Sequence, residues 1–407
     1  MHRWLGLTTG LVVFIVAITG CIYVFASDLQ DIFYRDRLYV EAQEGIPRLP
    51  ASELITRAEA ALDNKYPFFI LSYSPDPDKS VRLQAYQFNQ EKQTGLVRWY
   101  GDEIDYFYRA YLNPYTGELL KMEHTKWEFF NVVEFIHTSL LLGQFGRTVV
   151  SYAVLLFVFI LISGIVLWWP RNKAMFKKGT RFSWTDRTRW KRKNFDLHNV
   201  LGFYSMWIAL VIAITGLVWS FTWVNDGLQW LANGGQTVKS SVKSVQSDTT
   251  KIVVPSDLPL DWVYADVGSV FPEADQFIIV IPRSREGAII VYGRTSEDIT
   301  GFMASYDQYT GQELDRYSTA ELSNGEQLRW LNYSIHVGSI LGMPGKVLAF
   351  LASMTCAFLP VSGFLIWWNR RPKKKRKSPG RTKALPSRNK QKTTPKKKQE
   401  KRQTANS

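Results

Sequence analysis

Residues 201–224 read LGFYSMWIALVIAITGLVWSFTWV and carry no charged side chain. Because a helix needs about 20 apolar residues to cross the hydrocarbon core of a bilayer, this stretch predicts one membrane-spanning helix. A histidine, His198, lies just before it in DLHNVLGFY. The rest of the chain is organised around this pairing of a histidine with a membrane helix.

The same arrangement occurs four times in two tandem halves. At an offset of 196 residues, HRWLGL (2–7) matches HNVLGF (198–203), and AITG (17–20) matches AITG (213–216). At an offset of 199, IHTSLLLGQFGR (136–147) matches IHVGSILGMPGK (335–346), and SGIVLWW (163–169) matches SGFLIWW (362–368). Four of the five histidines, His2, His137, His198 and His336, therefore occupy corresponding positions.

These patterns predict an α-helical bundle of four membrane helices, at about 4–25, 149–169, 201–224 and 347–368. Tryptophans end the second and fourth spans, as residues anchored at a membrane interface do. The loop 170–197 is rich in Lys and Arg and so marks the cytoplasmic side, with both termini inside and two large loops outside. The expected segments are a first span (1–25), an outer module (26–134), a histidine segment with the second span (135–169), a basic loop (170–197), the third span (198–224), a second outer module (225–330), a histidine segment with the fourth span (331–368) and a basic tail (369–407).

The net charge of +14 belongs to the end of the chain. Residues 370–407 hold 17 Lys and Arg against one acid, so the other 369 residues carry about −2. A low-complexity basic tail directly after a membrane helix is typical of a disordered topology determinant on anionic lipid, and no nucleic-acid partner is expected.

The two cysteines, Cys21 and Cys356, lie in predicted spans, and no CxxCH motif is present to indicate covalently attached haem.

The two large loops predict related α+β modules. Each has a helical stretch (52–67 and 257–275) followed by strands rich in aromatic and β-branched residues, such as FFILSYS and QFIIVIP. Both reach a similar turn, NPYTGELL at 113–120 and DQYTGQEL at 307–314, which is ordinary Asn/Asp–Gly turn chemistry. Residues 236–250, rich in Ser, Thr and Lys, predict a flexible connection.

The topology pairs the histidines by side. His2 and His198 begin outward-going helices, and His137 and His336 precede inward-going ones. Haem b takes two axial ligands, and facing helices in a bundle can each supply one. We therefore expect two bis-histidine sites, each holding one haem b through its iron. A histidine at a membrane interface is common, and duplication copies any residue, but four of five paired by side favour ligation. A structural zinc site would need about four ligands together.

Several residues near these sites have more than one interpretation. His2 is the weakest ligand, since almost nothing precedes it. His137 lies about 11 residues before its span, roughly 16 Å if helical, which predicts an outer haem at or above the lipid surface. Arg147 and Lys346 could pair with haem propionates, and His124 reads as a surface residue. Nearby glycines could admit a ring or serve helix packing; they are Gly6, Gly143, Gly202 and Gly342.

Electrons need an external source in this interpretation. No acidic residue lies within the core spans, so a carboxylate relay is not indicated. The cytoplasmic segments hold no GxGxxG or Walker motif and have no room for a flavin domain. A separate cytoplasmic electron donor is therefore expected.

The motifs HRWLGL with AITG, IHTSLLLG with SGIVLWWP, DLHNVLGFY and the YTGE turn resemble the PepSY-associated transmembrane (PepSY-TM) family over residues 1–371. The resemblance implies four membrane helices, PepSY-type extracytoplasmic modules and the bacterial inner membrane. Some members resemble ferric-siderophore reductases that hold haem b between histidines, which correspond here to His2, His137, His198 and His336. This chain departs from them in the short stretch before His2 and in lacking a fused flavoprotein reductase.

The sequence thus predicts a di-haem b oxidoreductase that carries electrons from the cytoplasm to the periplasm and reduces a ferric siderophore or other iron chelate. One alternative is a non-enzymatic PepSY membrane protein that binds a peptide or protein as a sensor, chaperone or inhibitor. Another is an electron-transfer subunit whose acceptor is a protein. The chelate, the donor and the oligomeric state do not follow from the sequence.

Overall fold

A computed structural model describes residues 1–43, 45–89, 98–240, 242–243, 245–251, 258–295 and 300–370. Its helices are α1 (His2–Tyr23), α2 (Ala26–Phe33), α3 (Arg35–Leu38), α4 (Ala51–Ala60), α5 (Tyr100–Glu103), α6 (Phe129–Ser139), α7 (Gly143–Trp168), α8 (Lys173–Thr180), α9 (Trp190–Ser220), α10 (Thr222–Ala232), α11 (Leu258–Val270), α12 (Asn324–Val337) and α13 (Gly342–Asn369). Its strands are β1 (Ile70–Tyr73), β2 (Val81–Phe88), β3 (Ile104–Leu112), β4 (Leu119–His124), β5 (Gln276–Val280), β6 (Ala288–Arg294), β7 (Gly301–Asp307) and β8 (Glu313–Ser318).

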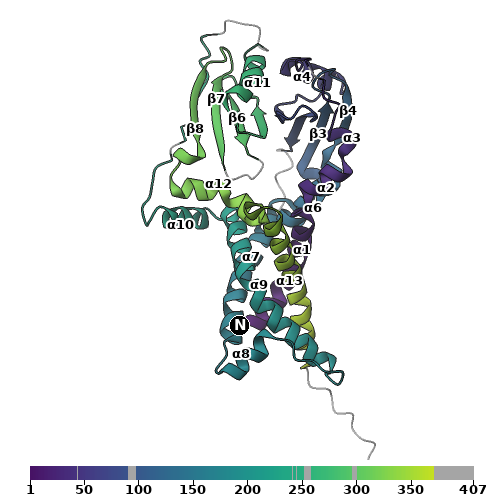
Figure 1. Ribbon diagram of the computed structural model, residues 1–407, viewed down its shortest axis with the longest axis vertical. Helices are drawn as coiled ribbons and strands as arrows, with labels where there is room; N and C mark the ends of the chain where they lie inside the picture. Colours follow the sequence, from purple (N-terminus) through teal and green to yellow (C-terminus); the bar gives the residue numbers. More distant parts are fainter. Residues whose placement is uncertain are drawn as a thin grey trace, which may run out of the picture. The chain divides into compact units, whose positions relative to one another are not determined.

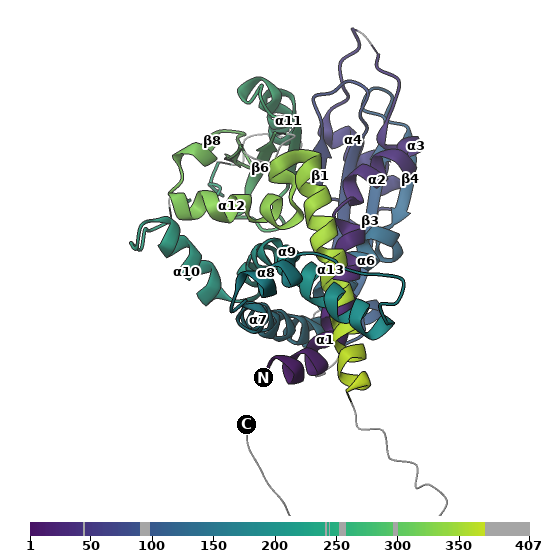
Figure 2. The same cartoon turned by 60° about the horizontal axis from the view of Figure 1, so that its bottom comes forward.

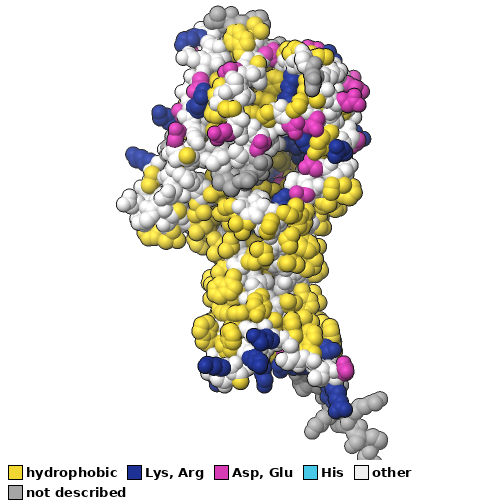
Figure 3. Space-filling model, viewed as in Figure 1, with side chains coloured by type: hydrophobic (Ala, Val, Ile, Leu, Met, Phe, Trp, Pro, Cys, Tyr) yellow, Lys and Arg dark blue, Asp and Glu magenta, His cyan; other side chains and the backbone are white. Residues whose placement is uncertain are grey.

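Four helices are long and apolar enough to cross a membrane, as the sequence predicts. They are α1, α7, α9 and the stretch Ser339–Asn369 that contains α13. Figures 1 and 2 show these helices side by side as one bundle. Apolar side chains cover the outside of this bundle, and Lys and Arg gather at the end near α8 (Figure 3). An apolar surface of this extent suits lipid, so the chain is a multi-pass membrane protein.

The helical conformation is interrupted between each outer histidine segment and the membrane helix that follows it. Leu140 and Leu141 have φ of 52° and 59°, and Gly143 has φ of 57°, so α6 cannot run on into α7. Gly338 (φ 80°) and Gly342 (φ 61°) separate α12 from α13 in the same way. A bend therefore separates each of these histidine helices from the membrane helix that follows it. The consequence is that α6 folds back along α1 instead of rising above it.

The predicted outer modules are joined into one antiparallel sheet. Each loop supplies four strands, in the order β4-β3-β2-β1-β5-β6-β7-β8. The junction is the pairing of β1 with β5, in which Leu71 lies opposite Ile279. The sequence led us to expect two α+β modules, and the structure joins their strands into a single sheet. Strand pairing removes the open edges that β1 and β5 would otherwise present to solvent.

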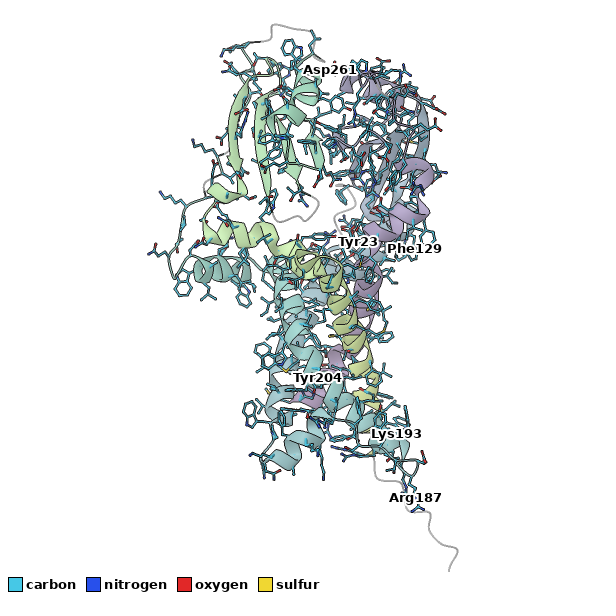
Figure 4. All side chains as sticks on the ribbon, in the orientation of Figure 1. Tyr23, Phe129, Arg187, Lys193, Tyr204 and Asp261 are labelled. Carbon is cyan, nitrogen blue, oxygen red and sulfur yellow. The ribbon has the colours of Figure 1, made fainter. Side chains whose placement is uncertain are left out.

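One hydrophobic core serves both halves of the sheet. Leu54 of α4 and Val267 of α11 are buried on it, together with Leu83 and Val291 from the strands. Asp261 of α11 accepts hydrogen bonds from the Ser52 backbone N–H (2.8 Å) and hydroxyl (2.6 Å) of α4. Figure 4 labels Asp261 beside α4 and α11. Because α4 has no side-chain cap of its own, Asp261 caps it from the other half.

The two predicted turns have the expected chemistry. The Asn113 side chain accepts from the Tyr115 N–H (2.9 Å), and Asp307 accepts from Tyr309 (2.9 Å). Gly117 and Gly311 follow with φ of 68° and 70°. The strands β4 and β8 come directly after these turns. The basic tail, from residue 371, and positions 241 and 244 of the predicted connection lie outside the described residues.

Candidate functional site

His2 opens α1 and is held by the last part of α7. Its Nδ1 lies 3.1 Å from the Ile160 carbonyl oxygen and 3.0 Å from the Ser163 hydroxyl. The corresponding residue of the second half, His198, places Nδ1 2.8 Å from the Ser362 hydroxyl of α13. The helix α7 therefore holds the His2 ring directly.

The other two histidines repeat this contact on α1 and α9. His137 Nδ1 lies 2.9 Å from the Val16 carbonyl and 3.2 Å from the Thr19 hydroxyl. His336 Nδ1 lies 3.1 Å from the Ile212 carbonyl and 2.9 Å from the Thr215 hydroxyl. Since Val16 and Thr19 belong to a membrane-spanning helix, His137 lies against the span itself. The distance of about 16 Å between His137 and its span assumed a continuous helix, and the positive φ angles of Leu140 and Leu141 interrupt that helix.

The hydroxyl groups fix the tautomer of all four rings. Each hydroxyl donates to a carbonyl on its own helix: Ser163 to Ile160, Ser362 to Leu359, Thr19 to Val16 and Thr215 to Ile212. Having donated its single proton, it can only accept from the imidazole, so Nδ1 carries the hydrogen. Among the described residues nothing bonds to Nε2 of these rings. Nε2 therefore keeps its lone pair, which is the form that ligates a metal.

A glycine lies next to each hydroxyl-bearing residue and touches the ring edge. A Cβ on Gly20 would stand 3.2 Å from Cε1 of His137, and one on Gly216 would stand 3.5 Å from Cε1 of His336. Gly164 and Gly363 have the same relation to His2 and His198, both at 3.4 Å. The glycines named from the sequence do not touch the rings. Gly143 and Gly342 lie where the helix is interrupted, a Cβ on Gly202 would meet the Leu359 side chain at 3.5 Å, and nothing is within 4 Å of a Cβ on Gly6.

The histidines meet in the predicted pairs. The imidazole centroids of His137 and His336 are 6.2 Å apart, with the ring planes at 74°. His2 and His198 are close enough to interact electrostatically. Trp219 contacts His336 edge-on, with centroids 5.2 Å apart. Each pair joins the two halves of the chain, one residue from each.

Burial keeps the outer pair neutral. Burial lowers the pKa of His137, and the Val16 carbonyl only partly opposes this shift. Burial, and then the charge of His137, lower the pKa of His336 to about 3. Both residues lie on α6 and α12, outside the candidate spans. A neutral imidazole at ordinary pH is a ready metal ligand.

These features fit a metal-ligand role for the four imidazoles. Metal–nitrogen bonds are about 2 Å long, so centroids 6.2 Å apart leave room for one metal ion between two rings. The Nδ1–H groups are bound to oxygen acceptors, as ligating histidines usually are. No group of three or more His, Cys, Asp or Glu able to hold a metal ion occurs within the described ranges. Two-ligand coordination of a planar cofactor such as haem b is the chemistry that this donor set suits.

The profile of the PepSY-associated TM region matches residues 1–370. The chain belongs to this family. A search of curated proteins found no match. In this PepSY-associated TM protein, the matched range includes all four membrane helices, the sheet and both histidine pairs.

In this PepSY-associated TM protein, the two cations suggested from the sequence as partners of haem propionates, Arg147 and Lys346, form ion pairs with acidic side chains. Arg147 pairs with Glu103, and the Lys346 ammonium lies 2.7 Å from Asp28. Both acids come from the segment outside the membrane helices, so these pairs tie α7 and α13 to it. His124, read as a surface residue, is exposed at the end of β4.

The residues that hold the rings were missed by sequence reasoning, although the signal was present. Thr19–Gly20 and Thr215–Gly216 are the ends of the two AITG motifs, and Ser163–Gly164 and Ser362–Gly363 start the two SGxxxWW motifs. These dipeptides served only to fix the register of the repeat. The recurrence of a hydroxyl-bearing residue followed by glycine in all four spans is the signal that identifies them.

Proposed function

We propose that this protein is a di-haem b oxidoreductase of the bacterial inner membrane that reduces ferric siderophores or other iron chelates. The observation that carries the proposal is the fourfold contact of an imidazole Nδ1–H with a Ser or Thr hydroxyl. It leaves four Nε2 lone pairs, two at each of two positions in the bundle. Bound haem supplies reversible one-electron chemistry, with a potential set by ligands and surroundings.

The protein's own contribution is to orient the ligands. The carbonyls of Ile160, Val16 and Ile212 and the four hydroxyls fix each ring at Nδ1. Asn332 donates to the Thr215 carbonyl (3.1 Å) and Asn194 to the Ser362 carbonyl (3.1 Å), which ties α12 to α9 and α9 to α13. Rigid, pre-set ligands reduce reorganisation when the charge on a bound metal changes.

Orientation in the membrane follows from the charges. The basic end of the bundle, with Lys193 and Arg187 labelled in Figure 4, is proposed to face the cytoplasm. His2 and His198 then form the inner site, and His137 and His336 the outer site, below PepSY-like modules in the periplasm. A separate cytoplasmic donor supplies electrons. Reduction loosens an iron chelate because ferrous iron is held less tightly by hard oxygen ligands.

Reoxidation by a ferric chelate tests this function. The purified full-length protein is reduced anaerobically with dithionite, freed of excess reductant and mixed with a ferric hydroxamate chelate and a ferrous-specific chromogenic trap. We expect oxidation of the protein with one ferrous ion released per electron. A haem-containing protein that stays reduced would instead indicate a protein acceptor. A colourless protein would leave a PepSY binding protein as the function.

A further inference from the structure

The sheet has a second face, opposite its hydrophobic core, and this face carries unpartnered buried polar atoms. Ser72 of β1 lies directly opposite Arg82 of β2, and Gln84, two residues along, lies directly opposite Arg109 of β3. Residues that are directly opposite, or two apart along a strand, point to the same side. Ser72, Arg82 and Arg109 therefore share one face across three neighbouring strands.

Three atoms of this group have no hydrogen-bond partner among the described residues. They are the Ser72 hydroxyl, the Arg82 Nε and the Arg109 Nε, and each is shielded from solvent. Ser72 is 4% exposed. A buried polar group without a partner costs free energy, and a buried charge costs more. The three atoms thus form a cluster of unused donors.

One acid lies against the cluster. Glu123 is directly opposite Arg109 and interacts with Arg82; one of its oxygens pairs with Arg37, and the other has no hydrogen-bond partner among the described residues. One carboxylate thus faces the three guanidinium groups of Arg37, Arg82 and Arg109. Burial, and then the charge of Arg109, lower the pKa of Arg82. Two like charges held together in a half-buried position are unfavourable unless an anion joins them.

The cluster also lies near the outer histidine pair. Arg109 interacts electrostatically with Tyr23, the last residue of α1, whose hydroxyl donates to Glu134 (2.9 Å). Glu134 is three residues before His137 on α6. Figure 4 shows Tyr23 at the end of the bundle that faces the sheet.

We propose that Ser72, Arg82 and Arg109 form a binding site for carboxylate groups beside the outer histidine pair. The guanidinium fork matches a carboxylate, and the serine hydroxyl supplies a further donor. This proposal rests on the proposed function and adds to it the chemical class of the ligand. The carboxylate has two possible sources: an iron chelate that carries carboxylates, or the propionates of a haem held by His137 and His336.

Citrate without iron is the probe, and KCl at matched ionic strength controls for screening. Calorimetric titration and melting temperature are measured on the full-length protein in detergent, in the wild type and in Arg82→Gln and Arg109→Gln. Arg285→Gln makes the same charge change at an exposed position and is the control. We expect citrate to bind about 10- to 100-fold more weakly to the first two variants than to the control.

A second measurement separates a binding role from a structural one. Without anion, Arg82→Gln removes a like charge and should raise the melting temperature. If Arg82 instead holds the sheet together, the variant melts lower without anion and citrate affinity is unchanged, which overturns the proposal.

Haem loading distinguishes the two sources. Binding of citrate to the haem-loaded protein assigns the site to a chelate. Binding only to haem-free protein, with a shifted reduction potential in Arg109→Gln, assigns it to a propionate. If neither citrate affinity nor potential depends on Arg82 and Arg109, the proposal is wrong. If the protein binds no haem but binds citrate in a way that depends on Arg82, the proposed function is wrong and the carboxylate site is supported.

Discussion

His137 and His336 are 199 residues apart in the chain, yet their imidazole centroids lie 6.2 Å from each other. Each ring is held through Nδ1 by the helix that begins its own half of the chain, α1 or α9. Each half of the chain supplies one histidine, so neither half alone contains the pair. Disturbing one helix is therefore expected to affect one position without removing the other.

The Ser362 hydroxyl gives a direct test of the ring contacts. In Ser362→Ala, His198 loses the acceptor 2.8 Å from its Nδ1. Loss of such a partner typically weakens metal binding about 10- to 100-fold, so haem at the His2/His198 position should dissociate more readily. Haem retention is measured by titration and visible spectroscopy. Thr355→Ala is the control, because the hydroxyl of this half-buried α13 residue donates to the Leu351 carbonyl of its own helix and, among the described residues, to no histidine. Equal retention in both variants would refute the role of Ser362.

Gly20 tests the close approach of helix and ring. A Cβ at this position would stand 3.2 Å from Cε1 of His137, closer than most such contacts, so Gly20→Ala should displace the imidazole. We expect loss of the outer haem with the inner one retained. Gly6→Ala, on the same helix with nothing within 4 Å, is the control and should stabilise α1 by up to about 1 kcal/mol. Identical haem content in the two variants would show that Gly20 gives no space to the ring.

Asp261 tests the coupling between the two halves of the sheet. Asp261→Ala leaves the Ser52 N–H at the start of α4 without its acceptor, which should cost about 1 kcal/mol of stability. Thermal unfolding of the single variants, of Ser52→Ala and of the double variant measures the interaction. A coupling energy within error of zero would mean that this contact does not join α4 to α11.

Protonation of the Asp307 carboxylate is expected to lower the stability of the fold in acid. Burial alone would raise its pKa, but hydrogen bonds from the backbone of Asp248, Tyr309 and Thr310 and from the Thr310 hydroxyl outweigh it and lower the pKa below 3.8. The ionised form thus stabilises the fold above pH 3.8, and this contribution is lost as the pH falls through the lowered pKa. Melting temperature measured from pH 6 to pH 3 should fall more steeply in the wild type than in Asp307→Asn. The two curves should be parallel if the carboxylate is not responsible.

The sequence predicts the four helices, the histidine pairs and the turns because a repeat and a hydropathy pattern are local signals. The pairing of β1 with β5 could not be predicted, since it joins edge strands some 200 residues apart through backbone groups that any sequence carries. The depth of His137 was misjudged because left-handed Leu140 and Leu141 are rare and no glycine marks them. The Thr–Gly and Ser–Gly dipeptides were visible, but their contacts appear only when the helices pack.

The most direct test of the two bis-histidine sites is the haem count per chain, with a reduced-minus-oxidised spectrum, in the wild type and in single His→Ala variants. About two low-spin b haems per chain are expected in the wild type. His2→Ala or His198→Ala should lose one, His137→Ala or His336→Ala the other, and His124→Ala, at the exposed end of β4, neither. A wild type without haem after expression with an ample haem supply, or a haem content that no histidine variant changes, would contradict it.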